Sequence, residues 1–272
     1  MIDAKTKLFG IIGNPVRESL SPTIHNAAFR RMGLNAAYLA FEVENLEEAV
    51  RGIRGLGIRG ISVTIPFKTQ IIPWLDKVDA VADKIKAVNT IANEGGRLVG
   101  YNTDWQGALE ALEEKVDVKR KKILLLGAGG AARAIGFGLK GKGGQVIISN
   151  RSPDKGHELA KDLGYVYEPL LSINEAGVDV IINATSVGMS PYETQSPLPK
   201  EVLKEGMVVM DIVYRPLKTR LLREAEEKGC DIINGLEMLA YQGAAQLEIW
   251  TGIKSEVEPI KEDLYRAIEM SP

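Results

Sequence analysis

The sequence contains few of the residues that form disulfides and metal sites. Among 272 residues there is one cysteine, Cys230, and there are two histidines, His25 and His157. One cysteine excludes an intramolecular disulfide, and the three residues together cannot supply a motif with zinc-ligand spacing. We therefore predict no disulfide framework and no metal site, and a reducing cytoplasm is the expected compartment.

An excess of charge of either sign is absent as well. The 34 basic residues nearly balance the 36 acidic ones, which leaves a formal net charge of −2. Such a balance provides no global field for nucleic acid or an anionic membrane, so any anion site must be local. No apolar run approaches the roughly 18 residues of a membrane span, and the first residues lack the apolar core of a signal peptide. The expected partner is a small molecule, and the length is sufficient for about two domains.

Residues 121–134 predict a strand, a tight turn and a helix around which the chain is organised. The spacing Gly127-x-Gly129-x-x-Ala132 fits the dinucleotide-binding fingerprint. A side chain at the first glycine would hinder the turn, and one at the second would push a pyrophosphate away from the backbone. The helix start would bind the diphosphate through its N–H groups and its dipole. We predict nucleotide binding, with an ordinary glycine-rich turn as the alternative.

The end of the next predicted strand, residues 145–151, indicates which nucleotide is bound. A cofactor with free ribose hydroxyls would be matched by an acidic residue about 20 positions after the turn. Here Asn150, Arg151 and Ser152 occupy that end, and Lys155 follows. Arg151 and Lys155 can pair with a 2′-phosphate, and cations at a helix start otherwise oppose its dipole. NADP is therefore predicted over NAD.

The alternation of predicted strands and helices indicates an α/β protein. Strand, helix and strand again in residues 8–68 imply parallel pairing with right-handed crossovers, and a hairpin follows around Glu94-Gly95-Gly96. Alternation over residues 122–235 predicts one doubly wound sheet. The expected domains are residues 1–103 (an α/β substrate domain), 104–236 (a Rossmann NADP domain) and 237–272 (helices that return to the first domain).

Polar residues of the first domain suggest a second binding region. Ser21 is the predicted cap of a helix that begins at Pro22. Ser19 and Ser21 place two hydroxyls beside that helix start, where they could hold a carboxylate, and capping alone is the alternative role of Ser21. Lys68 follows a predicted strand end, which is where open α/β sheets place ligands. From spacing alone a solvated lysine is the favoured interpretation of Lys68, and a helix cap is the simple interpretation of Asp104.

Taken together, nine motifs in order resemble the shikimate dehydrogenase family over nearly the whole chain. They are Ser19-Leu20-Ser21-Pro22, Val63-Thr64-Ile65-Pro66-Phe67-Lys68, Ala87-Val88-Asn89-Thr90, Gly100-Tyr101-Asn102-Thr103-Asp104, Gly127-Ala128-Gly129-Gly130-Ala131, Asn150-Arg151-Ser152, Asn183-Ala184-Thr185-Ser186-Val187-Gly188-Met189, Asp211-Ile212-Val213-Tyr214 and Gly235-Leu236-Glu237-Met238-Leu239. Nine motifs in a fixed order are far more specific than any one of them.

The resemblance implies reversible, NADP-dependent reduction of 3-dehydroshikimate to shikimate, within aromatic amino acid biosynthesis. It implies that Lys68 and Asp104 form the catalytic pair, in which the ammonium stabilises charge on the reacting oxygen and donates a proton. The implied substrate ligands are Ser19 and Ser21 for the carboxylate, Thr64, Asn89, Asp104 and Gln242 for the ring hydroxyls, together with Lys68 and Tyr214. The implied cofactor ligands are Gly127, Ala128, Gly129, Gly130, Ala131, Asn150, Arg151, Ser152, Lys155, Thr185, Ser186, Val187, Gly188, Met189, Ile212, Gly235 and Met238.

Three alternatives to this function stay open. A quinate/shikimate dehydrogenase with relaxed cofactor use would not need Arg151 and Lys155. A methylenetetrahydrofolate dehydrogenase would not account for serines at 19 and 21 beside Lys68 and Asp104. A non-catalytic nucleotide-sensing module predicts a damaged first domain. Ser152 departs from the threonine common in the family, although a hydroxyl is retained. The sequence leaves the oligomeric state open, and a homodimer is one state that it allows.

Overall fold

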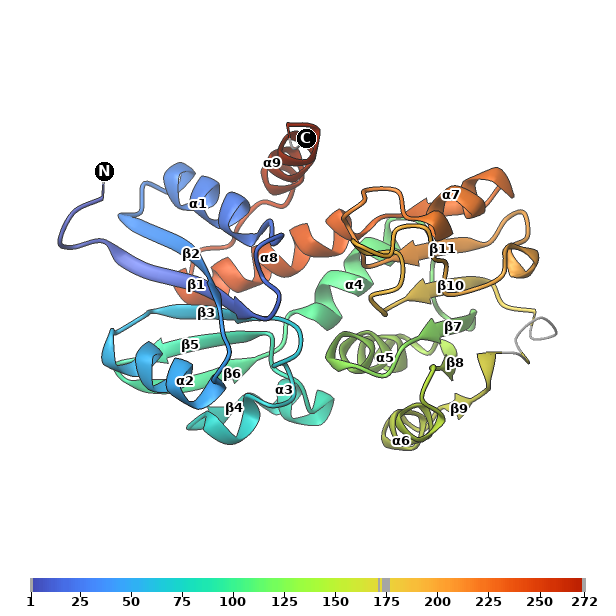
Figure 1. The fold of residues 1–272 in the computed structure, drawn as a ribbon, viewed down its shortest axis with the longest axis horizontal. Coiled ribbons are helices and arrows are strands. Elements are labelled where there is room, and N and C mark those ends of the chain that lie inside the picture. Colours follow the sequence, from blue (N-terminus) through green and yellow to red (C-terminus); the bar gives the residue numbers. More distant parts are fainter. Residues whose placement is uncertain (1, 171, 173–176, 271–272) are drawn as a thin grey trace. The chain divides into compact units, whose positions relative to one another are not determined.

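The chain folds as two compact units, each built on its own sheet (Figure 1). The computed structural model describes residues 2–170, 172 and 177–270. The first unit comprises Met1–Thr103 and Gln242–Pro272, and the second comprises Asp104–Tyr241. Among the described residues no helix is both long and apolar enough to span a membrane.

The first unit contains a mixed six-stranded sheet in the order β2-β1-β3-β5-β6-β4. Its strands are β1 (Lys7–Gly13), β2 (Ala36–Glu42), β3 (Gly60–Val63), β4 (Lys77–Val78), β5 (Thr90–Glu94) and β6 (Arg97–Tyr101). Strand β1 is parallel to β2 and β3, whereas β5 is antiparallel to both β3 and β6. The ends of β1, β3 and β6 and the start of β5 therefore lie at one edge of the sheet. We call this edge, with the loops that follow β1, β3 and β6 and precede β5, the carboxyl edge of the first sheet.

Helices pack on this sheet, and the last two of them come from the C-terminal part of the chain. The helical segments of the first unit are α1 (Ser21–Arg31), α2 (Leu46–Gly55), η1 (Ile72–Trp74), α3 (Ala80–Ile85), the later part of α8 (Gly235–Thr251) and α9 (Glu258–Glu269). On α8, the Trp250 indole donates to the Ile91 carbonyl at 3.0 Å. A Cβ at Gly60 would lie 2.5 Å from Trp250 Nε1, so β3 needs glycine there. The prediction that the C-terminal helices return to the first unit is confirmed.

The second unit contains a parallel six-stranded sheet in the order β12-β11-β10-β7-β8-β9. Its strands are β7 (Lys122–Leu126), β8 (Gln145–Ser149), β9 (Val166–Tyr167), β10 (Val180–Asn183), β11 (Val208–Asp211) and β12 (Asp231–Ile233), and its helical segments are α4 (Asp104–Glu113), α5 (Gly130–Lys142), α6 (Pro153–Leu163), η3 (Lys200–Val202), α7 (Arg220–Glu227) and the start of α8. The strand order reverses between β7 and β10, which makes this pair the topological switch point. The predicted doubly wound α/β sheet is confirmed.

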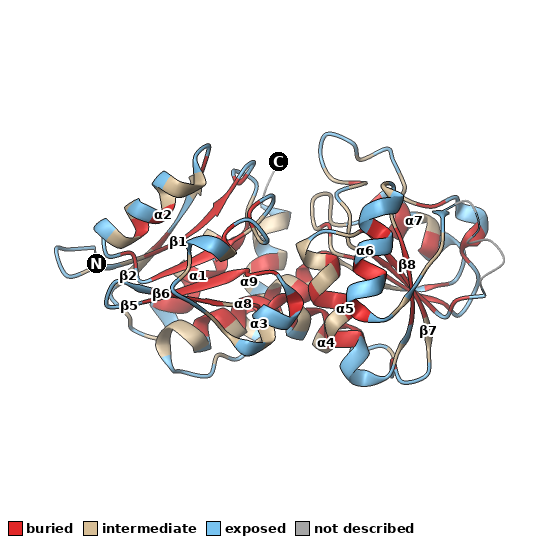
Figure 2. Cartoon of the chain, turned by 90° about the horizontal axis from the view of Figure 1, so that it is seen from below, coloured by how far each residue is buried: buried red, intermediate tan, exposed pale blue. Residues whose placement is uncertain are grey.

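Both faces of the second sheet are covered, as a doubly wound fold requires. Along β7, Ile123 and Leu125 belong to the core on the side of α4 and α5, whereas Leu124 and Leu126 belong to the core that includes Leu222 of α7. Buried residues run along the strands, and exposed residues lie on the outer faces of helices such as α2 and α6 (Figure 2). The apolar run of β7 is thus continuous because both of its faces are buried.

Several boundaries differ from the prediction. The prediction of Ser21 as the cap of α1 is wrong. Ser21 is the first helical residue, and Leu20 occupies the cap position without a side-chain hydrogen bond. The strand that begins at Gly60 was predicted to end at Ile65-Pro66 and instead ends at Val63, since the Phe67 N–H bonds back to the Thr64 carbonyl in a turn that contains Pro66. The two-residue strands β4 and β9 were not predicted, because so short a stretch carries no periodicity.

Candidate functional site

The turn after β7 brings three strand ends together at the switch point. Gly127 has φ of +117°, and a Cβ there would lie 3.0 Å from the Ala184 carbonyl oxygen and 3.3 Å from Thr185 Cγ2. Its N–H donates to the Ser149 carbonyl at 2.8 Å. Only glycine adopts this conformation readily and leaves room for the neighbouring loop. The predicted ligands after β7, β8 and β10 therefore share the carboxyl edge of the second sheet.

Gly129, unlike Gly127, has no structural need to be glycine. It is exposed and occupies the cap position of α5, with an ordinary φ of −86° and no side-chain hydrogen bond. A Cβ at Gly129 would meet nothing within 4 Å. Neither the protein's packing nor its backbone conformation requires glycine here, whereas a ligand that approaches the backbone would. Together with Ala128, Gly130 and Ala131 at the start of α5, this position fits an anion held at a helix N-terminus.

Cations gather at the start of α6, directly after β8. Arg151 and Lys155 are exposed, and neither has a hydrogen bond or ion pair with the residues that the structure describes. Asn150 Nδ2 donates to the Ser152 carbonyl at 2.9 Å, and Ser152 occupies the cap position of α6 without a side-chain bond. One acidic residue, Asp154, lies in this first turn. The loop can therefore present two positive charges to an anion.

The loop after β10 is shaped by a fully buried asparagine. Asn183 Oδ1 accepts from the Thr185 N–H at 3.1 Å and from its hydroxyl at 2.7 Å. Asn183 Nδ2 donates to the Val187 carbonyl at 3.1 Å and to Asp211 Oδ1 at 3.0 Å. These four bonds use the full capacity of the amide, so residues 184–187 are held in one conformation.

Asp211 at the end of β11 supports the same loop. Its carboxylate accepts from Asn183 and also from the Val213 N–H at 3.0 Å and the Thr219 hydroxyl at 2.7 Å. Burial raises the pKa of Asp211 to about 6, and the three donors act in the opposite direction. We call Asn183, Thr185, Asp211 and Thr219 the acidic network.

The remaining predicted cofactor ligands lie close to this network. Gly188 has φ of +93°, and a Cβ there would lie 3.3 Å from Thr219 Cβ. A Cβ at Gly235, the first residue of α8, would lie 2.4 Å from the Ile212 carbonyl oxygen. Met238 is buried one turn later in the core against which Ile212 packs. Ser186 is exposed and Met189 half-buried in the same loop. Tyr214, which was predicted among the substrate ligands, is half-buried after β11 and belongs to the second unit.

In the first unit, the two predicted carboxylate ligands are adjacent at the start of α1. The Ser21 N–H donates to Ser19 Oγ at 3.2 Å, and Ser21 is buried whereas Ser19 is half-buried. Burial raises the pKa of Tyr38, and side-chain hydrogen bonds with Ser62 and Ser21 act in the opposite direction. Ser21 therefore contacts a tyrosine of β2 in addition to beginning the helix.

Thr64 and Lys68 lie in the loop after β3. The Thr64 N–H donates to the Ile12 carbonyl at 3.0 Å, and a Cβ at Gly13 would lie 2.4 Å from Thr64 Cγ2. The Lys68 carbonyl accepts from the Val88 N–H at 2.7 Å. Both side chains are half-buried at the carboxyl edge of the first sheet. The backbone of Lys68 is thus bound to the segment that leads into Asn89.

Asn89 links several predicted ligands and is only 2% exposed. Its Nδ2 donates to the Thr103 hydroxyl at 2.9 Å and to Gln242 Oε1 at 3.4 Å, across 153 residues of sequence. Its Oδ1 accepts from the Thr103 N–H at 2.8 Å and from the Thr90 hydroxyl at 2.7 Å. Asp104, the next residue after Thr103, is buried and begins α4 in the second unit. The pairing of Lys68 with Asp104 joins residues of different units and stays a prediction.

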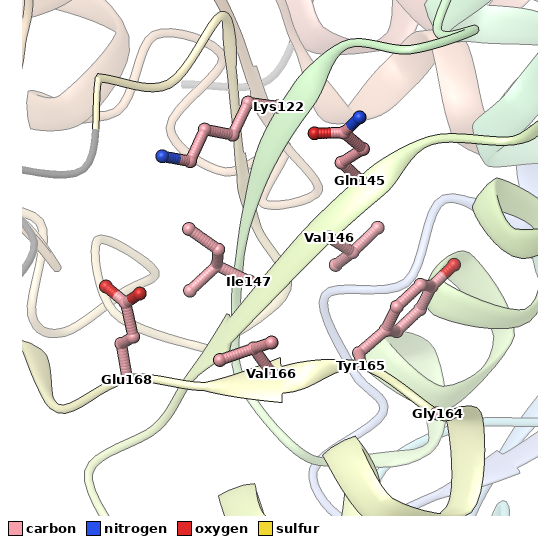
Figure 3. A pocket seen from close by; sticks show the side chains of 8 residues that line it. All are labelled: Lys122, Gln145, Val146, Ile147, Gly164, Tyr165, Val166 and Glu168. Atoms are coloured by element: carbon pink, nitrogen blue, oxygen red, sulfur yellow. The ribbon is translucent and has the colours of Figure 1, made fainter.

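The second unit also has a surface pocket that the predicted site does not use (Figure 3). It is lined by Lys122, Gln145, Val146, Ile147, Gly164, Tyr165, Val166 and Glu168. Lys122, Gln145 and Val166 are the first residues of β7, β8 and β9. The predicted cofactor ligands follow the other ends of β7 and β8, where parallel sheets bind ligands.

Sequence reasoning missed the polar residues that support Asn89. Thr90, Ser62, Tyr38 and His25 are buried together with Gln246 of α8, and none was predicted to serve the site. One signal was available for Gln246. It lies four residues after Gln242, and residues with this spacing share one face of a helix.

Comparisons with known proteins cover most of the chain. Three family models match: shikimate dehydrogenase substrate binding domain over residues 11–91, shikimate / quinate 5-dehydrogenase over residues 110–214, and shikimate 5'-dehydrogenase C-terminal domain over residues 235–265. The shikimate dehydrogenase (NADP(+)) of Thermococcus kodakarensis is 48% identical over 262 residues, which cover 94% of this chain and 95% of that protein.

Two solved structures are similar over nearly their full length. A crystal structure of shikimate dehydrogenase in complex with NADP+ has a TM-score of 0.93 and 47% identity, and the match covers 98% of each chain. The shikimate 5-dehydrogenase of Thermus thermophilus in complex with NADP(H) and shikimate has a TM-score of 0.90 and 40% identity, and the match covers 96% of this chain and 100% of that one.

Proposed function

This chain belongs to the shikimate dehydrogenase family, and on that premise we propose that it catalyses the reversible NADPH-dependent reduction of 3-dehydroshikimate to shikimate. One observation carries the proposal: each unit has a set of polar groups at the carboxyl edge of its own sheet. In the first unit, Asn89 and Gln242 are in contact beside Thr103. In the second unit, a glycine turn and two exposed cations follow β7 and β8.

The second unit suits NADP in particular. Gly129 leaves the start of α5 open for a pyrophosphate. Arg151 and Lys155 can pair with a 2′-phosphate, and Asn150 takes the place where an acidic residue would bind a free ribose. Ser152 adds a hydroxyl, and residues 185–189, Ile212, Gly235 and Met238 would border the nicotinamide. When bound, NADPH supplies the hydride for the reduction.

Most of the proposed substrate contacts come from the first unit, and Asp104 and Tyr214 would add contacts from the second. Lys68 would place its ammonium near the reacting oxygen, which gains negative charge as the carbonyl is reduced, and then donate a proton to that oxygen. Asp104 would orient Lys68 and accept a hydrogen bond from the neighbouring hydroxyl. Ser19 and Ser21 would bind the carboxylate. Ring hydroxyls would be bound by Thr64, Asn89 and Gln242, with Tyr214 as a further contact.

Initial rates test the proposal. The enzyme should oxidise shikimate with NADP. Replacing shikimate by quinate, or NADP by NAD, should reduce the rate by at least about tenfold, which corresponds to one lost polar contact. Comparable rates with quinate or NAD would move the chain to the broader quinate/shikimate branch. An absence of activity in all four pairings, with a folded protein, would contradict the proposal. The homodimer and the cytoplasmic compartment stay predictions of the sequence.

A further inference from the structure

Gln246 lies at the centre of a buried polar cluster in the first unit. It belongs to α8 and is 1% exposed. Its Oε1 accepts from the Ser62 hydroxyl at 2.9 Å and from His25 Nε2 at 3.2 Å. Its Nε2 donates to the Thr90 hydroxyl at 2.9 Å and to the Asn89 carbonyl at 3.2 Å. The amide therefore makes all four hydrogen bonds of which it is capable.

The hydrogen bonds of this cluster run in one direction. The Tyr38 hydroxyl donates to Ser62 at 2.6 Å, and Ser62 donates to Gln246. Gln246 donates to Thr90, and the Thr90 hydroxyl donates to Asn89 Oδ1 at 2.7 Å. We call Tyr38, Ser62, Gln246, Thr90 and Asn89 the neutral chain. Each hydroxyl of the chain donates its one proton to the next member, and such chains strengthen their members by mutual polarisation.

The orientation of the Gln246 amide is fixed by two donors. His25 is fully buried, and burial lowers its pKa to about 3 while the bond to Gln246 acts in the opposite direction. The neutral ring then has one N–H, which must be at Nε2 because Gln246 Oε1 can only accept. His25 Nδ1 has no hydrogen-bond partner among the described residues. The amide orientation agrees with its other side, because the Asn89 carbonyl can only accept and therefore requires Nε2 to face Asn89 and Thr90.

The direction of the chain determines what Asn89 presents to its other neighbours. Because Gln246 donates to Thr90, the one hydroxyl proton of Thr90 is left for Asn89 Oδ1. That oxygen also accepts from the Thr103 N–H. Both bonds occupy Oδ1, so Nδ2 is the atom directed at Thr103 Oγ1 and Gln242 Oε1. Gln242 Oε1 is therefore held as the acceptor of this contact.

We propose that Gln246 is a positioning residue for substrate binding, because it holds the Thr90 hydroxyl as a donor to Asn89 and thereby fixes the amides of Asn89 and Gln242. The proposal rests on the proposed function, in which these two amides bind ring hydroxyls. Gln246 is not a ligand itself. Its effect reaches the substrate through Thr90 and Asn89, both of which are part of the first unit.

The test compares conservative variants by their separate KM values for shikimate and NADP. Thr90→Val keeps the shape but breaks the chain, and Gln246→Glu removes both N–H donors and draws the Thr90 proton away from Asn89. Each should raise the KM for shikimate about tenfold, as one misdirected hydrogen bond would, with the KM for NADP unchanged. Thr90→Ser retains the hydroxyl and should restore the wild-type KM. An unchanged KM for shikimate in Thr90→Val would overturn the proposal, even if Gln246→Glu does not fold.

Asn93→Ala provides a matched structural control on the same strand, β5. Asn93 is also buried, and its side chain bonds to the Ile58 carbonyl at 2.9 Å and the Gly96 N–H at 2.7 Å, outside the neutral chain. This variant should lose stability without a change in the KM for shikimate. A tenfold rise in Asn93→Ala would mean that general destabilisation explains the effect, which would overturn the proposal.

A double-mutant cycle separates the inference from the proposed function. Asn89→Ala should raise the KM for shikimate, and Gln246→Glu should add nothing further in that background. If Gln246→Glu raises the KM for shikimate by the same factor in the wild type and in Asn89→Ala, Gln246 does not act through Asn89. If Asn89→Ala alone has no effect on this KM, the proposed role of Asn89 fails and the inference fails with it. An effect of Asn89→Ala together with normal kinetics in Thr90→Val would remove the inference only.

Discussion

Each unit holds its predicted ligands with a buried polar network, but the two networks differ in charge. The neutral chain of the first unit consists of amides and hydroxyls, with donors and acceptors in balance around Gln246. The acidic network of the second unit centres on Asp211, a carboxylate that accepts from Asn183, Val213 and Thr219. A carboxylate can receive several donors at once, here a side-chain amide, a backbone N–H and a hydroxyl, which ties three segments of the chain to one residue. An amide chain transmits orientation from one side chain to the next, which suits recognition of hydroxyls.

The same contrast appears in the glycines of the second unit. Gly127 is required by the protein itself, since a Cβ there would crowd Ala184 and the backbone has positive φ. Gly129 has open space and ordinary φ, so only a ligand gives it a reason to be glycine. A glycine with a structural reason and one without are therefore distinguishable from the geometry of the structure.

The largest expected effect concerns chemistry at the edge of the first sheet. Lys68→Ala should lower kcat by roughly 10²- to 10⁴-fold with little change in either KM, because the ammonium acts mainly in the transition state. Steady-state kinetics with shikimate and NADP measure this, and Lys84→Ala, which removes a lysine from α3, is the control. A higher KM with normal kcat would make Lys68 a binding residue only.

The two glycines should respond oppositely to alanine. Gly127→Ala should destabilise the protein by about 1 kcal/mol or more, since alanine resists positive φ. Gly129→Ala should leave the Tm within a few degrees of the wild type and raise the KM for NADP at least about tenfold, through a side chain in the path of the pyrophosphate. Thermal unfolding and kinetics on both variants test this contrast. Normal NADP kinetics in a folded Gly129→Ala would contradict a ligand at this turn.

Arg151 should distinguish the two nicotinamide cofactors. Arg151→Ala should raise the KM for NADPH about tenfold, by loss of one charge-assisted contact, and leave the KM for NADH nearly unchanged. Lys161→Ala, on the last turn of α6, the helix that follows Arg151, is the matched control for loss of a positive charge. Equal effects on both cofactors would indicate a structural role for Arg151.

Two buried groups, His25 and Asp211, should give opposite pH dependences of stability. The folded state lowers the pKa of His25 to about 3 from 6.5, so its contribution is present above pH 6.5 and is lost as the pH falls. The folded state raises the pKa of Asp211 to about 6 from 3.8, so its contribution is present below pH 3.8 and is lost as the pH rises through 6.

Two variants should separate these contributions. Relative to the wild type, His25→Phe should gain stability as the pH falls below about 6.5. Asp211→Asn should gain stability as the pH rises from about 4 to about 6, by at most about 3 kcal/mol. Urea unfolding at a series of pH values measures both. If the stability of both variants relative to the wild type changes with pH in the same direction, His25 and Asp211 do not have these shifted pKa values.

The sequence predicted the local features of this protein and the return of the C-terminal helices, but not the side-chain contacts that this return makes. The turn at Gly127 and the cations at Arg151 and Lys155 were predictable because spacing along the chain determines which element they follow. The contact between Gln246 and the Asn89 carbonyl was not, because it joins residues 157 positions apart. Only the return of α8 to the first unit brings these two segments together, and no local pattern encodes that register.

The cap of α1 illustrates a different limit. Serine before proline is the usual sequence pattern of a helix start, and it led to the wrong assignment of Ser21 as the cap. In the structure the Ser21 N–H is occupied by Ser19 Oγ, and Ser21 also bonds to Tyr38. Whether Ser21 caps the helix or bonds to Tyr38 depends on a residue of β2, which lies outside the local sequence pattern.

The central claim is that the first unit binds shikimate and the second binds NADP, and one kinetic experiment tests it most directly. Both KM values are measured in Asn89→Ala and in Arg151→Ala. We predict a crossed pattern, in which Asn89→Ala raises only the KM for shikimate and Arg151→Ala raises only the KM for NADP. A variant that raises the other KM, or both equally, would contradict the division of the two ligands between the two sheets.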